Sequence, residues 1–264
     1  MRKNRVRELI RAGKPTISTR MLTTSPQIVE MIGHTGVIDF IELMADYASW
    51  TVTDLENFAR AVELFPHMSS MIKVEEDPRL FITQRALGAG IQNILFADCD
   101  TAEEVKQCIR LVRPVLPQDG GLHGCSARRA SDYTLNNGSQ EWIQAQRDVV
   151  IEFMIESASA MEQLDDILSV PGVDMVHFGP CDFCLTSGYP YERTNPDLRI
   201  KNRMVMEKAL KHGVRPRAIV GSFEQAKEFA DMGVLDFCFG TDLDIIHSFC
   251  KSNGSKMREF FAKK

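Results

Sequence analysis

The sequence predicts an α/β fold and, within that class, a single-domain (β/α)8 barrel over residues 1–264. Three observations favour the barrel. The chain has the length of one such barrel. Apolar, strand-like runs alternate with segments of helical spacing, which is typical of a parallel sheet buried on both faces. An open, doubly wound sheet fits the same alternation, but no G-x-G-x-x-G follows any run and no Pro/Gly/Ser-rich linker divides the chain.

The expected elements follow this alternation along the chain. We expect strands at Thr16–Ser18, Val37–Leu43, Met68–Val74, Ile91–Phe96, Val149–Glu156, Val173–Gly179, Arg217–Gly221 and Leu235–Gly240. We expect helices at Thr51–Leu64, Pro78–Leu87, Ala102–Val112, Ser159–Leu168, Arg199–Lys211 and Phe223–Met232. Ser25-Pro26 and Asp77-Pro78 each place Pro at a first helical position, and Thr101 is a good N-cap.

The composition excludes several classes of partner. The chain has 31 Lys and Arg residues against 36 Asp and Glu, a net charge of −5, with no clustered basic segment. Neither nucleic acid nor an anionic membrane surface is therefore an expected partner. No stretch is apolar enough to span a membrane, and no apolar segment follows the basic N-terminus as in a signal peptide. We expect a cytoplasmic protein without a disulfide framework, since its seven cysteines are an odd number.

Two long connections, Arg113–Glu141 and Pro180–Pro196, are expected to follow the carboxyl ends of strands. A barrel of this kind carries its active site at that end, and long irregular loops there are usually functional. We accordingly expect substrate choice to depend on the shapes of Ala127–Gln140 and Ser187–Asn195.

Glu156 and Asp182 stand out among the polar residues at the expected strand ends. Each comes at or just after an apolar run, and buried carboxylates are rare unless a cation accompanies them. Their strands should be neighbours, so the two carboxylates could share one ion. Two protein oxygens, with the remaining positions left to water or substrate, suit Mg²⁺ or Mn²⁺. The alternative is a capping carboxylate and a solvated loop aspartate.

Lys73 ends the third expected strand and could hold a substrate carboxylate or oxyanion, or form a Schiff base. It could instead reach the surface and pair with Glu75 or Glu76. The Gly-rich loop 120–129 carries His123 and could approach an anion, although it is not a P-loop and a lone histidine is more often structural.

Five segments of the chain resemble the HpcH/HpaI aldolases, which are class II, metal-dependent pyruvate aldolases. The resemblance runs from about Val37 to Thr241, and its last segment is the most diagnostic. The segments are DFIELMADYA, IKVEEDP, ALGAGIQNILFADCDTAEEV, IESASAMEQLDDILSVPGVD and GPCDFCLTSGYP.

The resemblance implies a (β/α)8 barrel with specific roles for several residues. It implies that Glu156 and Asp182 hold Mg²⁺ or Mn²⁺. It also implies that Gly179, Pro180, Cys181 and Asp182 line the pocket of the pyruvate carboxylate. A homo-oligomer is implied as well, specifically a hexamer whose subunits exchange their last helix.

The sequence departs from the family pattern in its acid–base residues. The family's D-G-E-H segment carries a proton-transfer histidine, and Tyr47 replaces that histidine here. Lys73 replaces an arginine, and Met154 replaces a glutamine. A tyrosine has an ordinary pKa near 10 and is a poor base at neutral pH, so Asp46, His123 or a metal-bound hydroxide are alternatives to Tyr47.

The leading hypothesis is therefore a carbon–carbon lyase of the aldehyde-lyase class. It would cleave or form a 4-hydroxy-2-oxo acid through a pyruvate enolate, with a small 2-oxo acid and an aldehyde as partners. Decarboxylation of an oxaloacetate-like acid is one alternative, because loss of CO₂ gives the enolate without proton abstraction. A barrel that binds a keto acid or a protein partner without turnover is the other.

Overall fold

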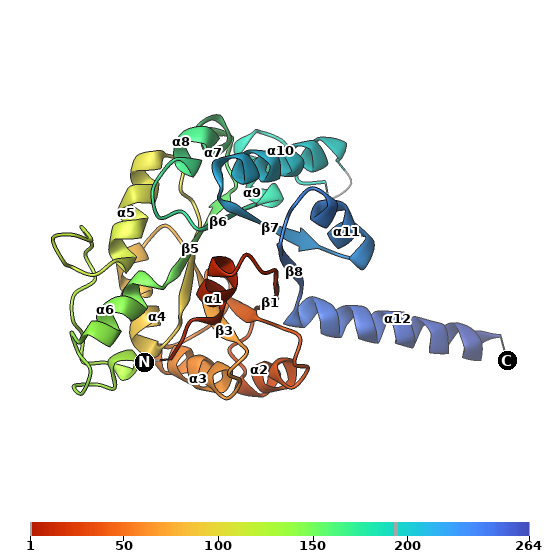
Figure 1. Cartoon of the computed structure of the whole chain (residues 1–264). Coiled ribbons are helices and arrows are strands. Elements are labelled where there is room, and N and C mark those ends of the chain that lie inside the picture. The colour runs from red at the N-terminus through yellow and green to blue at the C-terminus, as the bar shows by residue number, and fades with distance from the viewer. Residues whose placement is uncertain (1, 193–194, 264) are drawn as a thin grey trace.

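A computed structural model describes residues 2–192 and 195–263 of the chain, and residues 193 and 194 of the expected loop Ser187–Asn195 lie outside this description. The strands form a closed parallel barrel in the order β1 to β8, as the sequence predicts (Figure 1). They are β1 (Thr16–Met21), β2 (Phe40–Met44), β3 (Ser69–Val74), β4 (Asn93–Phe96), β5 (Val150–Ile155), β6 (Met175–Phe178), β7 (Arg215–Val220) and β8 (Asp236–Thr241).

Helices surround the barrel. They are α1 (Arg5–Arg11), α2 (Pro26–Gly33), α3 (Val52–Glu63), α4 (Arg79–Ala89), α5 (Ala102–Val112), α6 (Gln140–Arg147), α7 (Ala158–Glu162), α8 (Leu164–Leu168), α9 (Pro180–Thr186), α10 (Pro196–His212), α11 (Phe223–Asp231) and α12 (Asp242–Ala262), with a 3₁₀ turn at Arg129–Ser131. The predicted N-cap at Thr101 is confirmed, since its hydroxyl accepts the Glu104 N–H at 3.2 Å. The sequence analysis did not predict α1, α6, α9 or α12.

The main apolar core lies between the barrel and the helices. Phe96 and Phe153 stack outside β4 and β5 with ring centroids 5.7 Å apart, and Phe58 joins them from α3. A smaller cluster, including Phe40 and Met175, fills part of the barrel interior. Strands buried on both faces explain why the expected runs read as continuously apolar.

A polar cluster lies inside the barrel, below the end at which the strands finish. Arg217 of β7 is fully buried and forms ion pairs with Glu42 of β2 and, at 2.9 Å, with Glu152 of β5. Glu152 also contacts His177 Nδ1 at 2.8 Å. Burial keeps the pKa of His177 well below its ordinary value, so this imidazole is neutral. The cluster joins four strands of the barrel, β2, β5, β6 and β7.

The connection 113–139 does not follow a strand, which corrects the sequence analysis. It follows α5 and leads through α6 into β5. Its first residue, Arg113, donates to the Val149 carbonyl just before β5 begins, at 3.0 Å. Helices of a barrel run back from the carboxyl ends of the strands, so this loop, including Ala127–Gln140, lies at the opposite end of the barrel from the expected active site. The connection after β6 does lie at the expected end.

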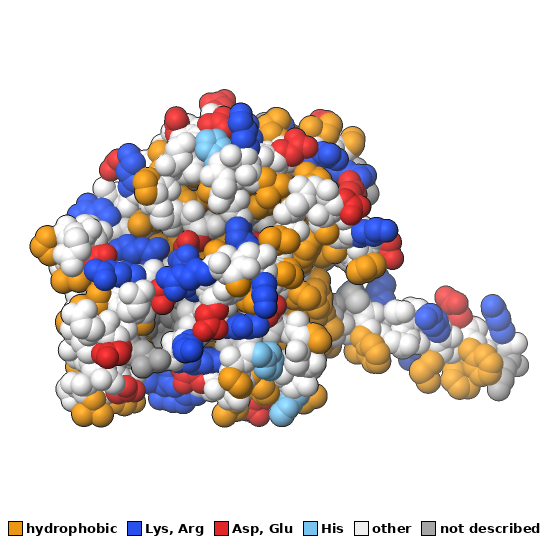
Figure 2. Space-filling view, in the orientation of Figure 1, with side chains coloured by type: hydrophobic (Ala, Val, Ile, Leu, Met, Phe, Trp, Pro, Cys, Tyr) orange, Lys and Arg blue, Asp and Glu red, His pale blue; other side chains and the backbone are white. Residues whose placement is uncertain are grey.

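The last helix, α12, leaves the barrel beside β1 and β8 and projects away from it (Figure 1). Most of its length carries exposed side chains, with apolar residues at helical spacing. These residues are Leu243, Ile245, Ile246, Phe249, Met257, Phe260 and Phe261. Figure 2 shows them as hydrophobic patches along the projecting helix. Over residues 2–192 and 195–263, no helix has the length and apolar character needed to cross a membrane.

Candidate active site

Glu156 follows β5 directly and lies at the mouth of the barrel, where the strands finish. Its side chain is buried, with 4% of the residue exposed, and Oε1 accepts the Asp98 N–H at 2.9 Å. It forms no ion pair with any residue in the described part of the chain. Burial raises the pKa of Glu156 to about 7, although the charge of Lys73 and the Asp98 hydrogen bond oppose the rise. Its ionised form therefore lacks a counter-ion in direct contact.

Asp182 lies in the first turn of α9, which begins where β6 ends. Its side chain is half-buried, whereas that of Glu156 is buried, so the two carboxylates differ in environment. The N-cap of α9 is Gly179, which has no side chain to accept a hydrogen bond from the helix. The N–H groups of Cys181 and Asp182 therefore face the mouth without a capping side chain, which is the usual form of an anion-binding helix end. Pro180 has no N–H to contribute.

Gly179 has a steric role at this point. Its own N–H donates to the Ile155 carbonyl at 2.9 Å and extends the pairing of β5 with β6. A Cβ atom on Gly179 would lie 2.7 Å from Cβ of Glu156 and 2.9 Å from Sδ of Met154. Glycine is therefore needed for the start of α9 to lie against Glu156.

Lys73, Asp46 and Tyr47 form a compact group on the other side of the mouth. Lys73 is the second-last residue of β3 and is buried, and its Nζ lies 2.6 Å from Asp46 Oδ2. Lys73 also donates to Tyr47 Oη at 3.2 Å, with its Nζ 4.7 Å from the ring centroid. The expected pairing of Lys73 with Glu75 or Glu76 is wrong, because Asp46 takes that place.

The charges within this group, together with burial, determine the protonation state of each member. Burial lowers the pKa of Lys73, but the Asp46 carboxylate outweighs burial, and the net result is a pKa above the ordinary value. Burial raises the pKa of Asp46 and that of Tyr47. At neutral pH Lys73 is thus an ammonium group and Tyr47 a phenol.

The charged side chains at the mouth lie close enough to shift one another's pKa values. The charges of Lys73 and Asp182 both act on the pKa of Glu156, and the charge of Asp182 acts on the pKa of Tyr47. The structure therefore brings together Asp46, Tyr47, Lys73, Glu156 and Asp182, which come from the ends of four strands.

The donor set fits a hard divalent cation. Glu156 is a buried carboxylate without a cation in contact, and Asp182 approaches from the next strand. In residues 2–192 and 195–263, no group of three or more His, Cys, Asp or Glu side chains converges as an all-protein metal cage. An ion held here would thus have two protein carboxylates and keep its other positions for water or substrate, as Mg²⁺ and Mn²⁺ commonly do.

His123 lies outside this group. It is buried beside Trp142 of α6, with ring centroids 5.6 Å apart, and its backbone N–H donates to the Arg113 carbonyl. Burial lowers the pKa of His123 to about 4. His123 belongs to the loop after α5, so it is at the opposite end of the barrel from Glu156. The structure therefore does not bring it to the mouth, contrary to the expectation.

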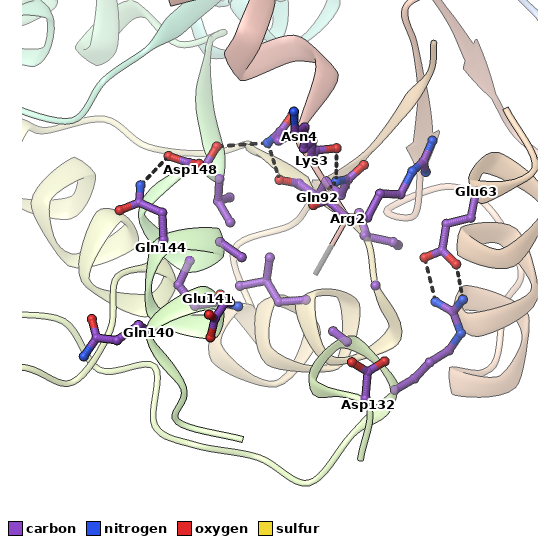
Figure 3. Close-up of a pocket in the computed structure, with 18 of the residues that line it drawn as sticks. Arg2, Lys3, Asn4, Glu63, Gln92, Asp132, Gln140, Glu141, Gln144 and Asp148 are labelled. Atoms are coloured by element: carbon purple, nitrogen blue, oxygen red, sulfur yellow. Dashed lines mark hydrogen bonds and ion pairs between the residues drawn. The ribbon is translucent and has the colours of Figure 1, made fainter. Parts of the chain in front are cut away.

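A cavity of about 860 Å³ lies at that opposite end, between α3, α4, α6 and the N-terminal segment (Figure 3). Both arginines in its wall are already engaged: Arg129 pairs with Glu63, and Arg2 donates to backbone carbonyls of residues 62, 65 and 68. Asn4 and Gln92 form further structural hydrogen bonds in its wall. The cavity is separate from the carboxylates of the mouth.

The sequence analysis missed one charged residue of the mouth, Arg20. It is the second-last residue of β1, and its backbone pairs with Glu42 of β2 and Thr241 of β8. Its neighbour Met21 packs in the outer core, so Arg20 faces the barrel interior. The expected strand ended at Ser18, before this position. Extending the expected strand by two residues, with side chains alternating inward and outward, would have placed Arg20 inside the barrel.

The fold is a (β/α)8 barrel whose mouth brings two carboxylates, Glu156 and Asp182, beside the uncapped start of α9. A family model described as HpcH/HpaI aldolase/citrate lyase matches residues 45–247, and the chain belongs to this family.

Individual relatives agree with that assignment. The chain is 30% identical over 198 residues to 2-keto-3-deoxy-L-rhamnonate aldolase of Salmonella gallinarum, covering 74% of this chain and 71% of that protein. It is 23% identical over 244 residues to 4-hydroxy-2-oxo-heptane-1,7-dioate aldolase of Shigella boydii, covering 92% and 90%. The crystal structure of a family member from Burkholderia cenocepacia superposes with a TM-score of 0.87 at 21% identity, over 97% of this chain and 100% of that one, which shows the same fold.

Proposed function

We propose that the protein is a metal-dependent carbon–carbon lyase that cleaves or forms a 4-hydroxy-2-oxo acid through the enolate of pyruvate. The observation that carries the proposal is Glu156, a buried carboxylate without a contacting cation, placed between Lys73 and the uncapped start of α9. Family membership supports the reaction class, and both relatives described above are named as aldolases of oxo or keto acids.

Glu156 and Asp182 would hold the divalent ion, Mg²⁺ or Mn²⁺. When bound, such an ion supplies Lewis-acid stabilisation of the negative charge that develops on the keto oxygen. The N–H groups of Cys181 and Asp182 would bind the carboxylate of the 2-oxo acid, and Gly179 and Pro180 would leave room for it.

Lys73, Tyr47 and Asp46 would stabilise the developing negative charge and transfer the proton. The Lys73 ammonium has three N–H donors, of which Asp46 and Tyr47 take two, so one remains for a developing oxyanion. Tyr47, as a phenol, can donate a hydrogen bond or a proton to the aldol oxygen. Asp46 is the better base, because burial raises the pKa of its carboxyl and its Oδ1 has no hydrogen-bond partner among the described residues.

The direct test is the release of pyruvate from a panel of 4-hydroxy-2-oxo acids by purified protein with Mg²⁺ or Mn²⁺. We expect release that a chelator abolishes, and a loss of at least about 100-fold in Glu156→Gln and Asp182→Asn. Glu76→Gln, on an exposed residue near the end of β3, is the matched control. Absence of pyruvate release across the panel would overturn the proposal, and keto-acid binding in that case would indicate a barrel that binds without turnover.

Decarboxylation of an oxaloacetate-like acid is a second candidate, favoured by the raised pKa of Tyr47. Loss of CO₂ forms the enolate without a base, so the reaction tolerates a phenol where the family has its histidine. Two measurements distinguish the candidates: CO₂ release from oxaloacetate, and exchange of the methyl protons of pyruvate in D₂O. Decarboxylation without exchange would favour this candidate over the aldolase.

We also propose that the protein is a homo-oligomer, a hexamer by family resemblance, in which α12 packs on a neighbouring subunit. The support is the row of exposed apolar residues on a helix that projects from its own barrel (Figures 1 and 2). Exposed apolar patches of this kind are typical of protein interfaces.

A further inference from the structure

Arg20 is an inward-facing cation at the mouth that the proposed chemistry does not use. Its side chain forms no hydrogen bond or ion pair with any other residue of the described chain, and its Nε is buried without a partner. Its side chain is only half-buried, so its head can be reached from the mouth. A guanidinium is always charged in proteins, and a charge that is partly removed from water is stabilised by an opposite charge.

The other inward cations already have carboxylate partners. Lys73 is paired with Asp46 at 2.6 Å. Arg217 is paired with Glu152 and with Glu42, the residue beside Arg20 in the sheet register. The carboxylate closest to Arg20 in the sheet is therefore occupied, and Arg20 is left with capacity for an external anion.

The position of Arg20 separates it from the pyruvate end of the site. Glu156 follows β5 and the amides of α9 follow β6, whereas β1 lies across the ring of strands from both. Arg20 nevertheless faces the same space, because it lies near the carboxyl end of β1 with its side chain directed into the barrel, and its charge acts on the pKa of His177 in β6. A substrate bound at Glu156 and α9 can therefore extend across the mouth toward Arg20.

We propose that Arg20 determines substrate specificity by binding a carboxylate at the far end of the substrate, so that the protein selects aldehydes bearing an acid group and the 4-hydroxy-2-oxo diacids formed from them. This inference rests on the proposed aldolase function. The planar guanidinium matches a carboxylate with two parallel hydrogen bonds, which a neutral aldehyde cannot form.

The test compares two aldehydes of equal chain length, succinic semialdehyde and butanal, each with pyruvate and Mn²⁺. We expect the wild type to prefer succinic semialdehyde. Arg20→Gln should lower kcat/KM for it by about 10- to 100-fold, mainly through KM, and change that for butanal by less than about twofold. Arg20→Lys should retain part of the preference. Arg60→Gln removes the same charge from the exposed face of α3 and should alter neither aldehyde.

An equal loss for both aldehydes in Arg20→Gln, or a wild type without preference for the acid, would overturn the inference. An equal loss accompanied by a lower Tm would indicate that Arg20 instead balances the buried carboxylates of the barrel. Arg20→Lys keeps the charge and serves if Arg20→Gln does not fold.

A protein that is not an aldolase would give a different result in these experiments. If the wild type turns over neither aldehyde, calorimetric binding of succinic semialdehyde replaces kinetics. Binding that weakens about 10-fold or more in Arg20→Gln, but not in Arg60→Gln, would support the Arg20 site alone. Equal binding by the wild type and Arg20→Gln would reject it.

Discussion

At the scale of single residues, Glu156 shows how a functional group is kept at a cost in stability. Its carboxyl is buried beside Gly179 and Met154, and among the described residues only the Asp98 N–H contacts it as a hydrogen-bond donor. The fold therefore favours the protonated carboxyl, whereas a divalent cation would favour the ionised one. A residue chosen for stability alone would carry no charge at this position.

Replacing Glu156 should consequently stabilise the protein when metal is absent. The pKa of Glu156 is about 7 in the fold against 4.5 for an ordinary glutamate. As pH rises from about 4.5 through 7, the unfolded chain loses this proton before the folded chain does, so stability falls. With a chelator present, we expect Glu156→Gln to raise the free energy of unfolding by about 1–3 kcal/mol at pH 8 and by less than about 1 kcal/mol at pH 5. Urea denaturation at both pH values measures this, with Glu76→Gln as the control, and an equal gain at both would contradict it.

Lys73 gives a second prediction at this scale. An amine must lose its proton before it forms a Schiff base, and the Asp46 carboxylate at 2.6 Å holds the pKa of Lys73 above its ordinary value. We expect borohydride with pyruvate to leave both the mass and the activity of the protein unchanged. A reduced pyruvate adduct that is absent from Lys73→Arg would show that Lys73 forms an imine after all.

At the scale of elements, the start of α9 joins the two halves of the site. The helix begins immediately after β6, and its N-cap is the glycine that lies against Glu156. The start of α9 and the Glu156 carboxyl are thus held in one arrangement by backbone contact. The pairing of Gly179 N–H with the Ile155 carbonyl keeps this arrangement in register.

Gly179→Ala should disturb that arrangement without unfolding the barrel. The added Cβ would lie 2.7 Å from Cβ of Glu156, so the carboxylate must move. We expect Mn²⁺ affinity, measured by calorimetry, to fall by about 10-fold or more. Gly124→Ala is the matched control, because a Cβ there meets only Val115, at 4.0 Å. Unchanged Mn²⁺ affinity in Gly179→Ala would show that Glu156 can move without cost or does not hold the ion.

At the scale of the whole molecule, α12 lacks a partner surface on its own barrel over most of its length. Its apolar residues Leu243, Ile246, Phe249 and Met257 follow one another at spacings of three, three and eight residues, and so share one face. Such a face is stable in water when another surface covers it.

Phe249→Glu should therefore dissociate the proposed oligomer. A charge buried in an apolar interface is strongly unfavourable, and we expect light scattering to shift toward the mass of one chain, 29.8 kDa. Ser255→Glu places the same charge half a turn around the helix from Ile246 and should leave the mass of the assembly unchanged. A wild type that is itself monomeric would contradict the prediction.

The sequence by itself determined the repeating strand–helix order and hence the barrel, because apolar periodicity is a local property that the parallel sheet requires. It also identified Glu156 and Asp182 as candidates, since a carboxylate at the end of an apolar run is unusual wherever the chain folds.

Only the tertiary structure decided which charges meet. The partner of Lys73 is Asp46 rather than Glu75 or Glu76, and Arg20 has none in the described chain, because partners are set by the closure of the barrel. His123 was misplaced for the same reason. A long loop after a helix resembles one after a strand in sequence, yet the two lie at opposite ends of the barrel.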